Sequence, residues 1–193
     1  MGVTDGRLGL RDRKKMRTRD TIRREAMRLI DENGYATTTI EQIAAAADIS
    51  PSTFFRYFPT KESVLIANDL DRVTVEALEA QPANLPSVQA FRNALETTMA
   101  TLSEADWAFE RNRLRVVLSV PELKAAQFDE YQRTIAHLAR AECRRRGRDT
   151  DDFEVRVFVG ALAGGLMAVL DDASDAMQRM YRALDFIQAG MPI

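Results

Sequence analysis

The segment from Thr39 to Lys61, TIEQIAAAADISPSTFFRYFPTK, constrains the fold of this chain more than any other. It predicts two short helices separated by a tight turn, because its apolar residues recur at helical spacing and Ser50-Pro51 is a typical helix start. Asp48 lies at the turn, where Asp tolerates a left-handed backbone. Helices of about two turns are not stable alone in water, so the pair must pack against other helices. Such a pair projects the end of its second helix, a shape that fits the major groove of DNA.

Charge is distributed unevenly along the chain. Residues 1–61 carry 12 Lys or Arg and 8 Asp or Glu, although the chain of 193 residues has a net charge of −2. Within residues 11–24 there are 8 basic and 2 acidic residues. A basic run alone is usually a solvated helix face, but this run adjoins the helix-turn-helix pattern. Contact with a nucleic acid is therefore the better interpretation.

The pattern along the chain predicts an all-α fold, because no segment shows sustained alternation of apolar and polar residues. We expect nine helices: a long one over about residues 11–33, the two motif helices, and six more over about 61–81, 87–103, 106–119, 122–146, 151–170 and 174–189. Residues 1–10 are expected to form a mobile arm. Two domains are expected, an N-terminal DNA-binding head over residues 1–60 and a C-terminal ligand-binding and dimerisation body over residues 61–193.

Composition argues against several other classes of protein. The single Cys143 and single His137 do not suit a disulfide framework or a Cys/His metal site. There is no apolar run of membrane-spanning length, no signal-peptide core, no Gly-rich phosphate loop and no Ser/His/Asp grouping. We therefore expect no catalytic residue, metal or cofactor, and a cytoplasmic location. Two alternatives stay open, a helical-bundle enzyme without DNA specificity and a protein-interaction module that docks through its apolar C-terminal helices.

The motif TIEQIAAAADISPSTFFRYFPTKES, with the basic helix and Gly34-Tyr35 before it, resembles the head of TetR-family transcriptional regulators over about residues 12–66. The resemblance implies a bacterial protein, bound to the nucleoid when it binds DNA, that acts as a two-fold homodimer. It also implies a small-molecule effector, whose binding most often releases a repressor from a palindromic operator.

The resemblance also assigns candidate DNA-binding residues. The residues expected at phosphates are Thr39, Tyr57 and Lys61, those expected at base edges are Pro51, Ser52, Thr53 and Phe55, and Arg56 is a further candidate for either. The basic residues Arg13, Lys14, Lys15 and Arg17 can follow the DNA backbone or enter the minor groove. Phe55 stands where the family often has Tyr, and Asp48 replaces a common Gly. We expect Ile43, Ile49, Phe54 and Phe58 to be buried instead.

The body is expected to hold an apolar effector pocket between Ser87 and Asp172. Its candidate lining residues are Phe91, Leu95, Met99, Leu102, Trp107, Leu114, Leu118, Phe128, Tyr131 and Phe158. The segment RNRLRVVLSVPELKAAQFDEY is similar to the effector domain of actinobacterial regulators found near mycofactocin gene clusters, which implies an acyl-coenzyme A-like ligand. Arg111, Arg113 or Arg115 can then meet its phosphates. Alternatively, Arg111 and Arg115 lie on a solvated face and pair with Glu110 or Asp106.

Two apolar stripes mark the last two predicted helices. Their interface candidates are Val155, Val159, Leu162, Leu166, Met177, Tyr181 and Leu184. Gly160, Gly164 and Gly165 lie beside the first stripe, and glycines inside a helix suggest a close approach of another helix. The stripes suit either packing within one subunit or a two-fold four-helix interface. We favour dimerisation because a helix-turn-helix protein normally needs two copies to read its site.

Overall fold

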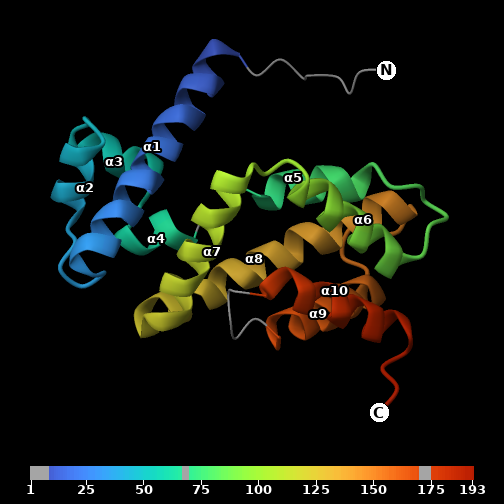
Figure 1. Cartoon of the computed structure of the whole chain (residues 1–193). Helices are drawn as coiled ribbons and strands as arrows, with labels where there is room; N and C mark the ends of the chain where they lie inside the picture. The colour runs from blue at the N-terminus through green and yellow to red at the C-terminus, as the bar shows by residue number, and fades with distance from the viewer. Residues whose placement is uncertain (1–8, 67–69, 170–174) are drawn as a thin grey trace. The chain divides into compact units, whose positions relative to one another are not determined.

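The computed structural model describes residues 9–66, 70–169 and 175–193, and all regular secondary structure in these ranges is helical (Figure 1). The first four helices are α1 (Leu10–Asn33), α2 (Ile40–Ala46), α3 (Pro51–Tyr57) and α4 (Lys61–Ile66). The next six are α5 (Leu70–Glu79), α6 (Ser87–Met99), α7 (Glu104–Ser119), α8 (Pro121–Arg146), α9 (Phe153–Met167) and α10 (Ala176–Gln188). The predicted all-α class is confirmed.

The described residues contain ten helices where the sequence predicts nine. The difference arises in the expected helix over residues 61–81, which is present as α4 and α5. Residues 67–69 between them lie outside the described residues, as do residues 1–8 of the expected N-terminal arm and residues 170–174.

The chain divides into two compact units, residues 1–67 and residues 68–193. We refer to these units as the head and the body. The head extends beyond the expected boundary at residue 60 because α4 belongs to its core. Val64 of α4 is buried in the same cluster as Ile22 of α1, Ile43 of α2 and Phe54 of α3.

Local sequence determines the helix pair in the head. Thr39 and Gln42 form a capping box at the start of α2, which satisfies backbone donors that the first helical turn leaves free. Asp48 adopts φ of 53° at the turn, as its residue type predicts. Ser50 then caps α3 by accepting a hydrogen bond from the N–H of Thr53, and Pro51 occupies the first turn.

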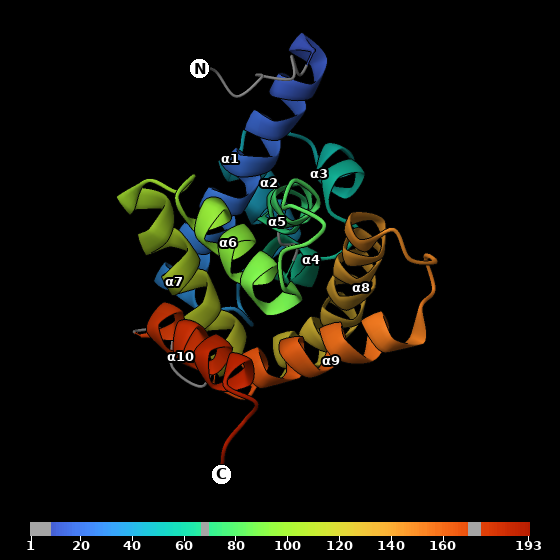
Figure 2. The ribbon, with the colours of Figure 1, turned by 90° about the vertical axis from the view of Figure 1, so that its right-hand side faces the viewer.

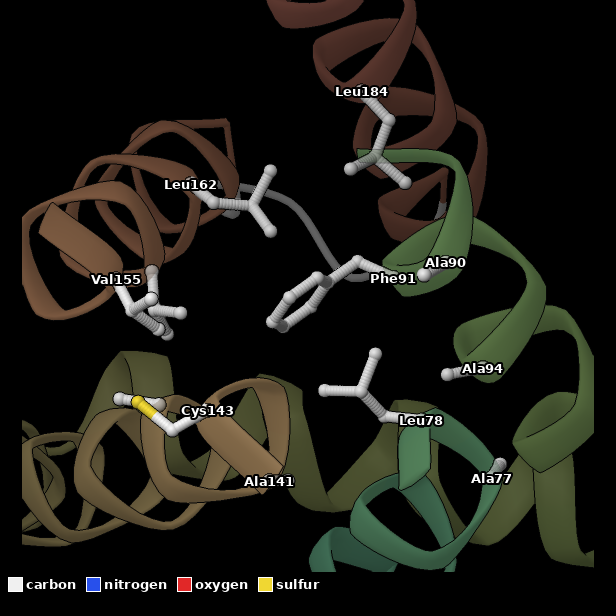
Figure 3. Packing of buried hydrophobic residues seen from close by; sticks show 12 residues of the cluster. Ala77, Leu78, Ala90, Phe91, Ala94, Ala141, Cys143, Val155, Leu162 and Leu184 are labelled. Carbon is white, nitrogen blue, oxygen red and sulfur yellow. The ribbon is translucent and has the colours of Figure 1, made fainter. Parts of the chain in front are cut away.

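The body is a helical bundle in which α8 packs against α5, α7 and α9. Helix α10 contacts both α9 and α6. Figure 2 shows α9 and α10 along the lower part of the view, where they meet. Figure 3 shows the centre of the body, where the ring of Phe91 lies among Leu78, Leu162 and Leu184. Side chains from α5, α6, α9 and α10 thus share one core.

A buried ion pair ties α8 to the segment before α6. The guanidinium of Arg145 lies 2.7 Å from the carboxylate of Glu142, and the two side chains are 0% and 1% exposed. Arg145 also donates to the carbonyls of Pro82 and Leu85, while the Ser87 hydroxyl donates to Glu142. The pair therefore satisfies the polar groups of the Pro82–Pro86 connection, where no helix supplies partners.

Replacing Arg145 by Ala should lower the free energy of unfolding of the body by about 3–5 kcal/mol, because Glu142 would keep a buried charge without its partner. Arg144→Ala is the matched control, since Arg144 pairs with Glu79 at the exposed surface. Its cost should stay below about 1 kcal/mol. Urea titrations followed by circular dichroism measure both changes, and equal effects of the two substitutions would contradict the role of the buried pair.

Candidate nucleic-acid interface and effector cavity

Helix α3 has two faces with different roles. Phe54 is 0% exposed within the core of the head, and Phe58, just after the helix, is also buried. The rings of these two residues lie 6.0 Å apart. Phe55, next to Phe54 in sequence, is 51% exposed. The helix is therefore anchored by one side and presents the other to a partner.

The exposed side of α3 carries the residues predicted to face base edges. Pro51, Ser52 and Arg56 are exposed together with Phe55, and Thr53 is half-buried. The Thr53 hydroxyl accepts a hydrogen bond from the hydroxyl of Ser50 at 3.0 Å. The structure thus brings the predicted base-facing residues together on one short helix.

Thr39 and Tyr57, two of the predicted phosphate contacts, both lie at the surface of the head. Thr39 is exposed and accepts the N–H of Gln42 at 3.2 Å, which leaves its hydroxyl hydrogen free to donate. Tyr57 is half-buried, with the Arg56 guanidinium 5.6 Å from its ring centroid. Its backbone carbonyl accepts a hydrogen bond from Arg19 of α1, so α1 also fixes the end of α3.

Lys61, the third predicted phosphate contact, is bound within the head. Its ammonium donates to the carbonyls of Tyr35 at 2.9 Å and Thr38 at 3.1 Å and lies 4.0 Å from the Tyr35 ring centroid. The next residue, Glu62, accepts a hydrogen bond from the Tyr35 hydroxyl at 2.6 Å. Burial acts to raise the pKa of Glu62, but hydrogen bonds from Tyr35, its own backbone N–H and Thr60, together with the charge of Lys61, lower it. Lys61 thus holds the α1–α2 connection, a role that sequence reasoning missed.

The predicted basic residues Arg13, Lys14, Lys15 and Arg17 are exposed on the first turns of α1. Within the head, these turns extend away from α2 and α3 (Figure 1). They add exposed positive charge to the head at the N-terminal end of α1.

A cavity of about 650 Å³ lies in the body, among α5, α6, α7, α8 and α10. Four predicted pocket residues line it, namely Met99, Leu102, Trp107 and Leu114. The other six are not among its lining residues: Phe91 is core, Leu95 and Phe158 pack against that core, Phe128 is exposed, and Leu118 and Tyr131 are half-buried. The cavity is also lined by residues that the sequence did not single out for it, including Leu70, Gln127, Met177 and Met180.

The charged groups of this cavity are largely paired. Glu110 and Arg113 form an ion pair of 2.7 Å with side chains that are 16% and 12% exposed. Arg111 lines the cavity but is exposed, and Arg115 is exposed and donates to Asn112 instead. Of the three arginines considered for a phosphate ligand, the structure therefore places Arg111 and Arg113 at the cavity and Arg115 outside it.

Most of the predicted dimer residues are buried or packed within one subunit. Val155, Val159, Leu162 and Leu184 are buried in the core of the body. Leu166 and Tyr181 pack against the same core, and Met177 lines the cavity. These side chains stabilise one subunit because residues of α5, α6 and α8 already pack against the face of α9 and α10 on which they lie.

The opposite face of α9 is exposed and apolar. Phe153 is 77% exposed and Val157 is 53% exposed, and Ala161, Gly164 and Met167 are exposed further along the helix. A Cβ atom at Gly160 would meet no atom within 4 Å, whereas one at Gly165 would lie 3.1 Å from Ile187 of α10. Close packing against another helix of the same subunit therefore accounts for the glycine at position 165 but not for the one at position 160.

Comparison with known proteins gives the family. Residues 22–68 match the model described as bacterial regulatory proteins of the tetR family, and residues 85–192 match the MftR C-terminal domain. The chain belongs to the TetR family. The head with its helix-turn-helix pair is thus the DNA-binding part of a transcriptional regulator, and the family consists of regulators and not enzymes.

Two proteins with similar sequences are named as transcriptional regulators. The HTH-type transcriptional regulator TcmR of Streptomyces glaucescens is 36% identical over 151 residues, which cover 75% of this chain and 67% of that protein. A mycofactocin biosynthesis transcriptional regulator, MftR of Mycobacterium tuberculosis, is 25% identical over 187 residues, with 93% of each chain covered. The structure of Salmonella enterica GusR shares the fold, with a TM-score of 0.56, 23% identity and coverage of 91% of this chain and 95% of that chain.

TetR regulators bind DNA and small-molecule effectors and act as dimers. Among the described residues, no group of three or more His, Cys, Asp and Glu side chains is arranged to hold a metal ion. Within the same ranges, every helix is too short or too polar to cross a membrane.

The neighbouring residues Phe54 and Phe55 should respond oppositely to truncation. Phe55→Ala should weaken specific DNA binding about tenfold, the size of one lost base contact, without changing stability. Phe54→Ala should instead lower the free energy of unfolding of the head by about 3–5 kcal/mol, because it leaves a cavity in the core. Mobility-shift titrations and thermal melts of both variants measure these effects. Normal DNA affinity in a fully folded Phe55→Ala protein would exclude this ring from the interface.

Proposed function

We propose that this regulator is a homodimeric repressor that binds a palindromic operator and is released from it by a small, largely apolar effector. The observation that carries the proposal is the exposed face of α3, where Pro51, Ser52, Thr53 and Phe55 project from a helix anchored by Phe54. A helix of this kind fits the major groove and reads base edges there. The protein would act in the bacterial cytoplasm, on the nucleoid.

The surrounding residues would position this helix on the DNA backbone. The hydroxyls of Thr39 and Tyr57 and the guanidinium of Arg56 are the proposed phosphate contacts. Arg13, Lys14, Lys15 and Arg17 would add charge from α1, in the groove or along the backbone. Lys61 contributes in a second way, because its two hydrogen bonds fix the chain that leads into α2.

The effector would occupy the cavity in the body, whose wall includes Met99, Trp107, Leu114 and Met180. A cavity of about 650 Å³ with this lining suits a small apolar molecule. The acyl-coenzyme A-like ligand implied by the mycofactocin-type resemblance stays a prediction.

The homodimer would form through the exposed face of α9. Phe153 and Val157 provide apolar area there, and Gly160 and Gly164 would allow the same helix of a second subunit to approach closely. Residues that are exposed in one subunit would then form the core of a two-fold helical interface.

The test of this function is footprinting on the intergenic DNA beside the gene. Two inverted half-sites should be protected, with centres about 34 Å apart or a multiple of that distance, because two α3 helices must enter major grooves on one side of the duplex. Protection of a single half-site would contradict the two-fold model. A protein that only docks on other proteins would show no preference for this DNA at near-physiological salt.

Val157→Glu should convert the dimer to monomers and weaken operator binding by at least tenfold, because a charge would be buried at the centre of the α9 interface. Light scattering after gel filtration gives the mass, and mobility shifts give the affinity. Ala136→Glu, at an exposed position of α8, is the matched control and should stay dimeric. A dimeric Val157→Glu protein would place the interface elsewhere.

A further inference from the structure

Two buried side-chain oxygens at the cavity accept no hydrogen bond in the structure, one on Gln127 and one on Asp175. The side-chain oxygen of Gln127 on α8 is inaccessible to solvent and accepts no hydrogen bond, and Gln127 is one of the residues that line the cavity. A buried acceptor without a donor costs about 1–3 kcal/mol. Such a group is normally satisfied, so an unpaired one on a residue that lines a cavity is a position where a bound ligand can supply the missing donor.

The charged residues of the cavity already have partners of their own. Arg113 is paired with Glu110. The Asp175 oxygen that accepts no hydrogen bond lies 2.7 Å from the Arg179 guanidinium, which compensates its charge. A ligand with a charged head would disturb these pairs or leave its own charge without compensation inside the protein. Arg111 is exposed and can compensate a charge only at the outer side of the cavity.

The remaining wall is apolar and adaptable. Met99, Met177 and Met180 are flexible side chains, and Trp107 provides a flat ring. Such a wall accepts an apolar body of variable shape but makes few directional contacts. Directional recognition would therefore depend on Gln127.

We propose that the effector of this cavity is an uncharged, mostly apolar molecule with a hydroxyl or N–H group that donates a hydrogen bond to the Gln127 side-chain oxygen. This inference rests on the proposed function only in naming the occupant an effector, because binding to the cavity can be measured without DNA. It defines the chemical class of the ligand: an apolar alcohol, phenol or amide in preference to a carboxylate or a phosphate ester.

Trp107 makes the proposal directly measurable. It is the only Trp of the chain and lines the cavity, so its fluorescence reports occupancy. The probes are 1-decanol, 1-methoxydecane, decanoate and decanoyl-coenzyme A, titrated into the full-length protein up to their solubility limits. The alcohol donates a hydrogen bond, the ether only accepts one, and the other two carry charge.

The wild-type protein should prefer decanol to methoxydecane. The ratio of the two affinities should be about fivefold larger in the wild-type protein than in the Gln127→Met variant, which is the effect of one hydrogen bond between neutral groups. Decanoate and decanoyl-coenzyme A should bind more weakly than decanol. Tyr131→Phe is the matched control, because the Tyr131 hydroxyl is also buried without a partner but Tyr131 does not line the cavity. That variant should keep the wild-type ratio.

Several results would overturn the proposal. These are an unchanged ratio in Gln127→Met, a preference for the ether, tighter binding of either charged probe, or no fluorescence change with any probe. Circular dichroism of each variant establishes that it is folded. Operator binding by the ligand-free protein is measured separately. If the ligand results contradict this inference, the proposed DNA binding is unaffected. If the protein fails to bind the operator, the ligand preference of the cavity can still be measured.

Discussion

The packing of Phe54 and Phe58 against the rest of the head is the interaction on which the DNA-reading surface depends. Helix α3 has seven residues, too few to persist alone in water. Burying Phe54 between α1 and α2 gives the helix a fixed position, and Arg19 fixes its C-terminal end through the Tyr57 carbonyl and the Phe58 ring. The exposed residues of α3 can then approach DNA without first becoming ordered, and ordering at the moment of binding would reduce affinity.

Long-range contacts also fix the segment that leads into α2. Thr39 caps this helix, and Lys61 and Glu62 at the start of α4 hold Tyr35 just ahead of it. Residues far apart in sequence thus meet at the entrance to the helix pair. This arrangement explains why a lysine that resembles a phosphate contact has two of its three donors committed inside the head.

The sequence predicted those features that depend on local chemistry. The caps at Thr39 and Ser50, the left-handed Asp48 and the burial of Phe54 follow from residue type and helical spacing over a few positions. The predicted dimer residues stay a prediction, because an apolar stripe indicates burial without showing what buries it. Val159 and Leu184 are covered by the chain's own α6 and α8, a fact set by tertiary packing. The exposed stripe from Phe153 carries small residues and gives a weaker periodic signal.

The cavity is a second feature that the sequence predicts only in part. Trp107 and Met99 are identifiable as large apolar residues on predicted helices, but nothing in the sequence distinguishes Gln127 from other glutamines. Its importance depends on two facts that only the fold provides: its oxygen is buried, and no donor in the described protein reaches it. The ion pair of Glu110 and Arg113 adds a physical reason for selectivity, since it neutralises the charge that would otherwise attract an anionic head. In the proposed complex an apolar wall supplies most of the binding free energy, and the unpaired acceptor of Gln127 decides which apolar molecule is bound.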